Sequence, residues 1–229
     1  MSCILSIETC TSYGSLALQM GDQLKTKEWH RPGSHSEIIT TELMSLLTES
    51  GVELADLSAI TVGIGPGSFT GIRIGVNLAK SLAYSLNLPV HGFDTLTGLA
   101  SQIQVGEHKT LVCLNAFRNL IYTATFRRPE QSSLNTIKVA AALTVDEIFQ
   151  QLDSPVHVIG TAIADFEDPP PGKRNMILSA VELRPKAQHY LELLNSAGPK
   201  ASSPKDWNQV SPLYVRASEA EEKLKSKDK

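Results

Sequence analysis

The sequence has few cysteines, and none of them forms a close pair. Cys3, Cys10 and Cys113 are an odd number, and no Cys-x-x-Cys spacing occurs. A disulfide framework needs paired cysteines and a cysteine-based zinc site needs closely spaced ones, so neither is expected to hold the fold together. Cys3 and Cys113 lie in apolar runs and are predicted to be buried, whereas Cys10, in a polar loop, is a candidate reactive thiol.

The sequence also lacks an excess of positive charge. Its 229 residues carry 21 Lys and Arg against 24 Asp and Glu, a net charge of -3. Proteins that bind nucleic acid directly usually collect phosphates with a basic surface. Any role that involves tRNA is therefore predicted to pass through a partner protein.

Long hydrophobic runs are missing as well. No run approaches the roughly 20 apolar residues that a membrane-spanning helix needs. The first eight residues contain no basic segment followed by a long apolar one, so they do not form a signal peptide. We expect a cytoplasmic protein without membrane contact.

The apolar pattern predicts the same order of elements in both halves of the chain, a three-strand meander followed by helices that alternate with strands. This order is typical of an α/β protein with a duplicated ribonuclease-H-like, or actin-like, fold: two subdomains, each a mixed sheet flanked by helices. We predict subdomains at residues 1–105 and 106–217 and a charged tail at 218–229. The expected strands are 3–8, 14–20, 23–29, 59–64, 89–93, 111–116, 120–126, 136–139, 156–160 and 176–179, and the expected helices are 34–50, 69–86, 95–102, 144–152 and 186–195.

Two capping-box patterns mark predicted helix starts. Ser34 precedes Glu37 by three residues, and Thr144 precedes Glu147 by the same spacing. The stretch 198–209 is polar with two prolines and is interpreted as a linker, and 211–215 as a final extended segment.

The glycine-rich stretch 65–75 follows a predicted strand and opens a predicted helix. Free backbone N–H groups at such a turn can bind an anion. The alternative is tight packing of strand against helix, with Ser68 or Thr70 as N-cap. No Gly-Lys-Ser/Thr ending follows, so the turn is not a P-loop. The candidate anion- or nucleotide-binding residues are Gly65, Gly67, Ser68, Thr70, Gly71 and Arg73.

The string Gly-Pro-Gly-Ser-Phe-Thr-Gly-Ile-Arg-Ile-Gly at 65–75 resembles the signature of the TsaB/YeaZ family. Further segments match the family in the same order: residues 4–9, 34–37, 94–96 and 212–216. The resemblance implies an actin-like fold and a part in making threonylcarbamoyladenosine beside the anticodon of tRNA. It further implies a TsaD-like catalytic partner, a TsaE-like ATPase, and a homodimer when the chain is alone, with tRNA bound only through the complex.

Two departures from the family pattern concern charge. The first strand commonly ends in Asp but here ends in Glu8, and the usual Asp-Ala-Arg reads Asn115-Ala116-Phe117. In actin-like phosphotransferases, carboxylates at such strand ends hold Mg²⁺ and phosphates, and Asn115 cannot supply that charge. We therefore predict no catalytic residue, no metal ligand and no tightly bound cofactor, and place ATP or ADP with Mg²⁺ only at the interface of the complex.

Glu8 either lines a cleft or is a solvated or capping residue. The apolar faces of helices 34–50 and 69–86 exceed what one sheet covers. Such a surface is either an interface or is covered by the other subdomain, and the resemblance favours the interface. The candidate interface residues are His35, Ile38, Ile39, Met44, Ile74 and Leu78.

The sequence thus predicts a non-catalytic subunit that binds and activates a TsaD-like enzyme. An ATP-dependent phosphotransferase or ATPase of the actin-like class is the alternative. A protease acting on the partner is a further alternative, although no Gly-x-Ser-x-Gly motif is present.

Overall fold

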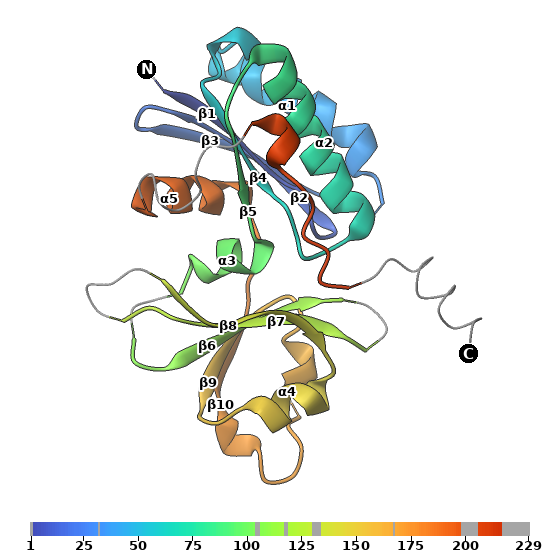
Figure 1. Ribbon diagram of the computed structural model, residues 1–229, viewed down its shortest axis with the longest axis vertical. Coiled ribbons are helices and arrows are strands. Elements are labelled where there is room, and N and C mark those ends of the chain that lie inside the picture. The colour runs from blue at the N-terminus through green and yellow to red at the C-terminus, as the bar shows by residue number, and fades with distance from the viewer. Residues whose placement is uncertain are drawn as a thin grey trace, which may run out of the picture.

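The computed structural model describes residues 2–31, 33–103, 106–116, 119–129, 134–166, 168–197 and 206–216. It contains two five-stranded sheets, ordered β3-β2-β1-β4-β5 and β10-β9-β6-β7-β8, one above the other in Figure 1. In each sheet an antiparallel meander continues into parallel strands. The predicted fold, two mixed sheets flanked by helices, is confirmed.

The elements follow the predicted order. The first-sheet strands are β1 Cys3–Glu8, β2 Tyr13–Met20, β3 Gln23–His30, β4 Ala59–Gly63 and β5 Val90–Phe93, and the helices of this half are α1 His35–Ser50, α2 Phe69–Leu86 and α3 Thr95–Ala100. The second-sheet strands are β6 Lys109–Asn115, β7 Ile121–Arg127, β8 Asn135–Leu143, β9 Val156–Gly160 and β10 Ile177–Glu182. Helix α4 Val145–Gln151 lies between β8 and β9, and α5 Ala187–Ala197 follows β10. The expected strand 136–139 was too short, because β8 pairs with β7 along most of its length.

Helices cover both faces of the first sheet (Figure 1). Helices α1 and α2 pack on one face through an apolar stripe that includes Leu43, Leu46, Ile72 and Val76. Helix α5 lies on the other face, against β1, β2 and β4. Since β1 and β4 have helices on both sides, they are almost wholly buried, including the polar Ser6, Glu8 and Thr61.

The position of α5 changes the meaning of the predicted subdomains. The boundary near residues 104–109 separates the two sheets, but 104 and 105 lie outside the described residues. Helix α5 comes after the second sheet in sequence and yet packs on the first. The division at 105 therefore separates α5 in sequence from the sheet that it covers.

The start of α1 differs from the capping-box prediction. Ser34 is the N-cap, but its side chain makes no capping hydrogen bond. His35 instead ties the helix to the meander: its Nδ1 accepts from Trp29 Nε1 at 2.9 Å, and its Nε2 lies 2.7 Å from the carbonyl of Thr11. An indole N–H can only donate, so Nε2 carries the imidazole proton and donates to Thr11. The second capping box, Thr144 with Glu147, is confirmed.

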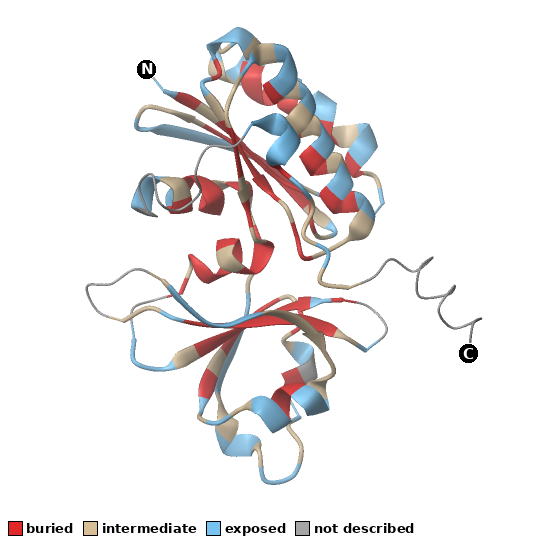
Figure 2. Cartoon of the chain, viewed as in Figure 1, coloured by how far each residue is buried: buried red, intermediate tan, exposed pale blue. Residues whose placement is uncertain are grey.

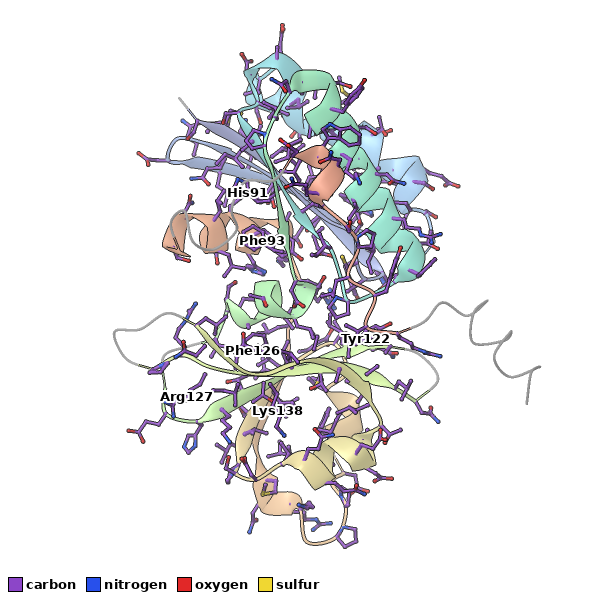
Figure 3. The ribbon with its side chains drawn as sticks, in the orientation of Figure 1. His91, Phe93, Tyr122, Phe126, Arg127 and Lys138 are labelled. Atoms are coloured by element: carbon purple, nitrogen blue, oxygen red, sulfur yellow. The ribbon has the colours of Figure 1, made fainter. Side chains whose placement is uncertain are left out.

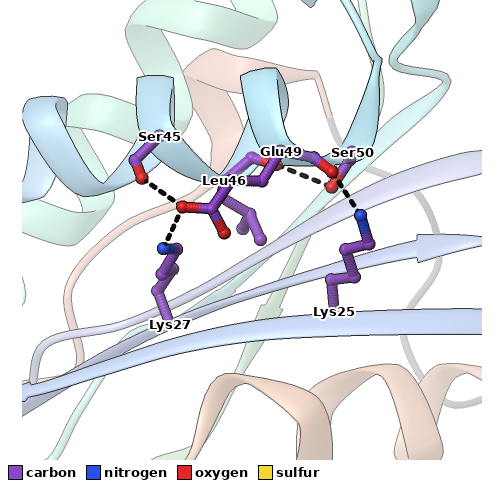
Figure 4. Close-up of polar contacts among 6 residues, drawn as sticks. All are labelled: Lys25, Lys27, Ser45, Leu46, Glu49 and Ser50. Carbon is purple, nitrogen blue, oxygen red and sulfur yellow. Dashed lines mark hydrogen bonds and ion pairs between the residues drawn. The ribbon is translucent and has the colours of Figure 1, made fainter.

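The end of α1 is held by β3 (Figure 4). Lys25 donates to the backbone carbonyl of Glu49, and Lys27 pairs with its carboxylate, which also accepts from Ser45. Gly51 ends the helix in the left-handed conformation, with φ 65°. Lysines near a helix C-terminus offset the partial negative charge of its last carbonyls, so this end of α1 is stabilised by the sheet it covers.

The second sheet has a separate core on each face. Helix α3 packs on one face, over Tyr122 and Phe126 of β7, both labelled in Figure 3, and α4 packs on the other through Ile148 and Phe149. Both residues of β7 are buried. Within the part of the chain that the structure describes, no helix combines the length and apolarity needed to cross a membrane.

His189 on α5 gives a test of how this helix is anchored. Burial, and then the nearby charge of Lys186, lower its pKa from 6.5 to about 4. A lowered histidine pKa stabilises the fold above pH 6.5, and this stability is lost as the pH falls toward 4. We expect the free energy of unfolding to drop by about 3 kcal/mol over this range, in urea titrations at successive pH values.

The matched change His189→Gln keeps an acceptor for the backbone N–H of Lys186 but does not titrate. It is expected to flatten the pH profile between 6.5 and 4. The control change His30→Gln, at an exposed histidine, should leave the dependence of stability on pH as it is in the parent protein. An unchanged slope in His189→Gln would contradict the assignment.

Candidate functional site

The glycine-rich turn is the point where four segments of the chain meet. Ser68 N donates to the carbonyl of Cys10 at 2.6 Å, and Thr95 N donates to that of Gly65 at 2.8 Å. From the end of the chain, Leu213 N donates to the carbonyl of Ile64 at 2.7 Å. The backbone groups of the turn between β4 and α2 thus connect it to the loop that follows β1, to α3 and to the C-terminal segment.

The glycines of the turn are required by close packing. A Cβ on Gly67 would overlap the carbonyl of Cys10, and one on Gly71 would overlap that of Thr9. The side chain of Ser68 accepts from Gly71 N at 3.3 Å, so Ser68 caps α2. The packing alternative therefore accounts for Gly67, Ser68 and Gly71 without a ligand.

The remaining candidate residues of the turn lie apart from one another. Gly65 has a positive φ of 108° and is buried, whereas Thr70 is exposed. Arg73 is also exposed, but its guanidinium lies 3.9 Å from the centre of the Phe69 ring and its Nε donates to Tyr214 Oη at 3.0 Å. The predicted anion cradle stays a prediction, and the structure gives Arg73 a structural role instead.

Glu8, at the end of β1, is buried and fully engaged. Its Oε1 accepts from the backbone N–H of Cys10 and its Oε2 accepts from the hydroxyl of Tyr190 on α5. Burial raises the pKa of Glu8, and these two hydrogen bonds partly oppose the rise. Exposure to solvent and exposure to an open cleft were therefore both wrong, because the side chain is buried beneath Tyr190. The hydrogen bond from the backbone N–H of Cys10 fits the remaining alternative, a capping residue.

Cys10 is equally inaccessible. It is fully buried beside Glu8, and burial together with that neighbouring carboxyl raises the pKa of its thiol well above the usual value. A thiol reacts through its thiolate form, so the prediction of a reactive Cys10 was wrong. Sequence alone missed Tyr190, since one tyrosine in a helix of the other half carries no signal that it reaches β1.

The second strand end of interest belongs to β6. Asn115 is exposed there, with its backbone N 3.5 Å from Thr161 Oγ1, and Phe117 lies outside the described residues. Neither strand end thus presents an accessible carboxylate of its own where actin-like enzymes hold Mg²⁺. Across the described ranges, no group of three or more His, Cys, Asp and Glu side chains is placed to hold a metal ion.

The outer surface of α1 and α2 is the other candidate site, and Figure 2 shows exposed residues along both helices. Met44 is 49% exposed, and Ile38, Ile74 and Leu78 are half-buried. Figure 1 places the second sheet away from this surface, which excludes the alternative that the other subdomain covers it.

Two of the predicted interface residues need correction. Ile39 is 3% exposed and belongs to the core under α1, and His35 is 4% exposed and bonded within the chain. Neither side chain is available to a partner. Tyr84, 69% exposed on α2, was missed, because it lies outside the apolar stripe from which the interface was predicted.

A C-terminal strap, residues 206–216, runs along α2 and then reaches the second sheet. The ring of Trp207 lies edge-on to Tyr84 with centroids 5.2 Å apart, and the ring of Tyr214 stacks on Phe69 at 4.6 Å. Arg216 then donates to the carbonyl of Ala116 at 2.9 Å. Of the predicted linker, 198–205 lie outside the described residues, as does the predicted tail at 218–229.

Removal of the Tyr190 hydroxyl tests the seal over Glu8. Tyr190→Phe leaves one buried carboxyl oxygen without its donor, which is expected to cost about 1–3 kcal/mol of unfolding free energy. Tyr84→Phe, which removes an exposed hydroxyl, is the control and should change stability by less than about 0.5 kcal/mol. Equal effects of the two changes in urea titrations would show that Tyr190 does not satisfy Glu8.

Comparison with known proteins places these features in a family. The family model described as "TsaD: tRNA N6-adenosine threonylcarbamoyltransferase" matches residues 32–222. The tRNA threonylcarbamoyladenosine biosynthesis protein TsaB of Escherichia coli is 29% identical, with 98% of this chain and 99% of that protein aligned. TsaB of Bacillus subtilis is 27% identical, with 96% of each chain covered.

Solved structures agree with the sequence comparisons. YeaZ from Pseudomonas aeruginosa superposes with a TM-score of 0.80 at 25% identity, over 93% of this chain and 100% of that one. The chain has the YeaZ fold, and the family model matches it over well more than half its length. On these grounds the chain belongs to the TsaB/YeaZ family.

Proposed function

We propose that this protein is a non-catalytic subunit in the synthesis of N6-threonylcarbamoyladenosine in tRNA. Its family supports the pathway, since relatives that match almost the whole chain carry the name of this biosynthesis. The seal over Glu8 supports the non-catalytic role and is the observation that carries it. A carboxyl group that is 0% exposed, and whose two oxygens accept hydrogen bonds from Cys10 and Tyr190, is closed to a metal or substrate from solution.

In this proposal a TsaD-like catalytic subunit binds the outer surface of α1 and α2. Met44 and Tyr84 provide exposed apolar area there, flanked by the half-buried Ile38, Ile74 and Leu78. Two amphipathic helices can pack against two others as a four-helix layer, a geometry that buries such side chains well. The same surface would form the homodimer when the catalytic subunit is absent.

The strap suggests how binding on α2 acts at a distance. It contacts α2 through Trp207 and Tyr214 and reaches the second sheet through Arg216. A partner that fixes α2 would therefore also fix the two sheets relative to each other. A TsaE-like ATPase and tRNA would join only the assembled complex, in the cytoplasm, with ATP or ADP and Mg²⁺ at its interface.

Reconstitution tests this function. The full chain, a TsaD-like enzyme, a TsaE-like ATPase and a supply of threonylcarbamoyl-adenylate are combined with tRNA, and modified adenosine is measured by mass spectrometry. We expect modification to fall at least tenfold when this chain is omitted. An undiminished rate without it would overturn the proposal.

The docking surface is tested by charge placement. Met44→Glu with Tyr84→Glu would place two carboxylates in the buried centre of the interface, which is expected to weaken binding by several kcal/mol. Val139→Glu, on β8 and 79% exposed, is the matched control and should leave complex formation intact. Size-exclusion chromatography with the catalytic subunit distinguishes the outcomes.

The rival function, an ATPase of the actin-like class, is favoured by the fold and by the glycine-rich turn. If the burial of Glu8 beneath Tyr190 prevents ATPase activity, calorimetry of the isolated chain with Mg-ATP should detect no heat of binding, and a turnover assay should detect no hydrolysis. Hydrolysis that persists in Arg73→Ala but disappears in Glu8→Gln would establish the enzyme instead.

A further inference from the structure

A pocket of about 550 Å³ lies on the second sheet, beside the segment that follows α3. It is lined from β6 by Thr110, from β9 by His157 and Ile159, and from β10 by Ser179 and Val181. Thr110 and His157 are near the N-terminal ends of their strands, whereas Asn115 is at the C-terminal end of β6. The pocket is thus distinct from the strand ends described above and from the outer surface of α1 and α2.

One wall of the pocket is apolar. Ile159 and Val181 face it from neighbouring strands, with Ile103 and Leu183 at the side nearest α3. The pairing of β10 with β9 shifts between Ile177 and Ser179, so Ile177 packs toward α4 while Ser179 and Val181 line the pocket. Such a shift is a common means of redirecting side chains at the edge of a sheet. The volume is within the range of small-molecule sites.

The other end of the pocket gathers hydrogen-bonding groups. His157 Nδ1 lies 2.7 Å from Ser179 Oγ, so Nε2 is the ring nitrogen left to meet a ligand. The ring of His108 stands edge-on to that of His157, with centroids 5.7 Å apart. An imidazole and a hydroxyl can each donate a hydrogen bond, and none of the described residues that line the pocket carries a carboxylate.

We propose that this pocket binds a small monocarboxylate with an apolar body. The carboxylate would accept hydrogen bonds from His108 and from Nε2 of His157, which carries the ring proton when Nδ1 accepts from Ser179, and the apolar body would lie on Ile159 and Val181. Charge-assisted hydrogen bonds favour an anion at these donors. An ammonium group would find no carboxylate there, and its unpaired charge would oppose binding.

Octanoate is the probe, and octylamine of the same chain length is the matched control compound. The full-length protein is titrated with each, and binding is followed by the NMR signals of the His108 and His157 imidazoles. We expect saturable binding of octanoate, at least tenfold tighter than that of octylamine. Ser179→Ala removes the hydroxyl that keeps the ring proton of His157 on Nε2, and should weaken octanoate binding about tenfold.

Val181→Trp fills the pocket and should abolish the titration. Leu178→Trp, a similar change at an exposed residue of β10 outside the lining, should retain it. If Val181→Trp does not fold, the octanoate affinity of Ser179→Ala and the affinity of the parent protein for octylamine still test the proposal. Equal binding of the two compounds, no saturable binding of octanoate, or unaltered affinity in Ser179→Ala would overturn the proposal.

Discussion

The buried contact between Glu8 and Tyr190 joins the first strand of the chain to α5 and closes the end of that strand to solvent. Glu8 ends the first strand, and Tyr190 comes from a helix more than 180 positions later. Its ring stacks on Phe93 and fills the space left by Gly63 and Gly98, where any Cβ would overlap it. Burial of a carboxyl group costs free energy unless both of its oxygens accept hydrogen bonds. The two glycines leave the space in which Tyr190 reaches Glu8, so the pairing of Glu8 depends on them as well as on the tyrosine.

The buried Glu8 and the surface of α1 and α2 are the two features on which the proposed non-catalytic role depends. Actin-like enzymes leave their strand ends open to nucleotide, whereas here the first strand end is closed from within the chain. The glycine-rich turn, a candidate anion site in the sequence, holds four segments together through backbone hydrogen bonds. Exposed apolar side chains lie instead on the outside of two helices, where the proposed partner would bind.

Much of the fold could be predicted from the sequence, because period-2 and period-3.6 apolar patterns are local. Strands β1 to β3, the left-handed Gly51 and the capping box at Thr144 all follow from neighbouring residues. The failures came from contacts distant in sequence. Nothing near Glu8 indicates that Tyr190 covers it, and nothing near Ser34 indicates that His35, bonded to Trp29 and Thr11, would take over the anchoring of α1. Likewise, the apolar pattern along helix 34–50 led to the prediction of Ile39 as an interface residue, but such a pattern does not distinguish a core position from an interface position.

The return of α5 and the strap to the first half makes the second sheet an insertion within another folding unit. The face of β1, β2 and β4 that α5 covers carries Ser6, Glu8, Ser15 and Thr61 beside small apolar residues, and α5 can reach it only after residues near 190 have left the ribosome. During synthesis the second sheet can complete its pairing first, since all its strands precede α5. The N-terminal unit, though translated earlier, is therefore the later of the two to reach its native state.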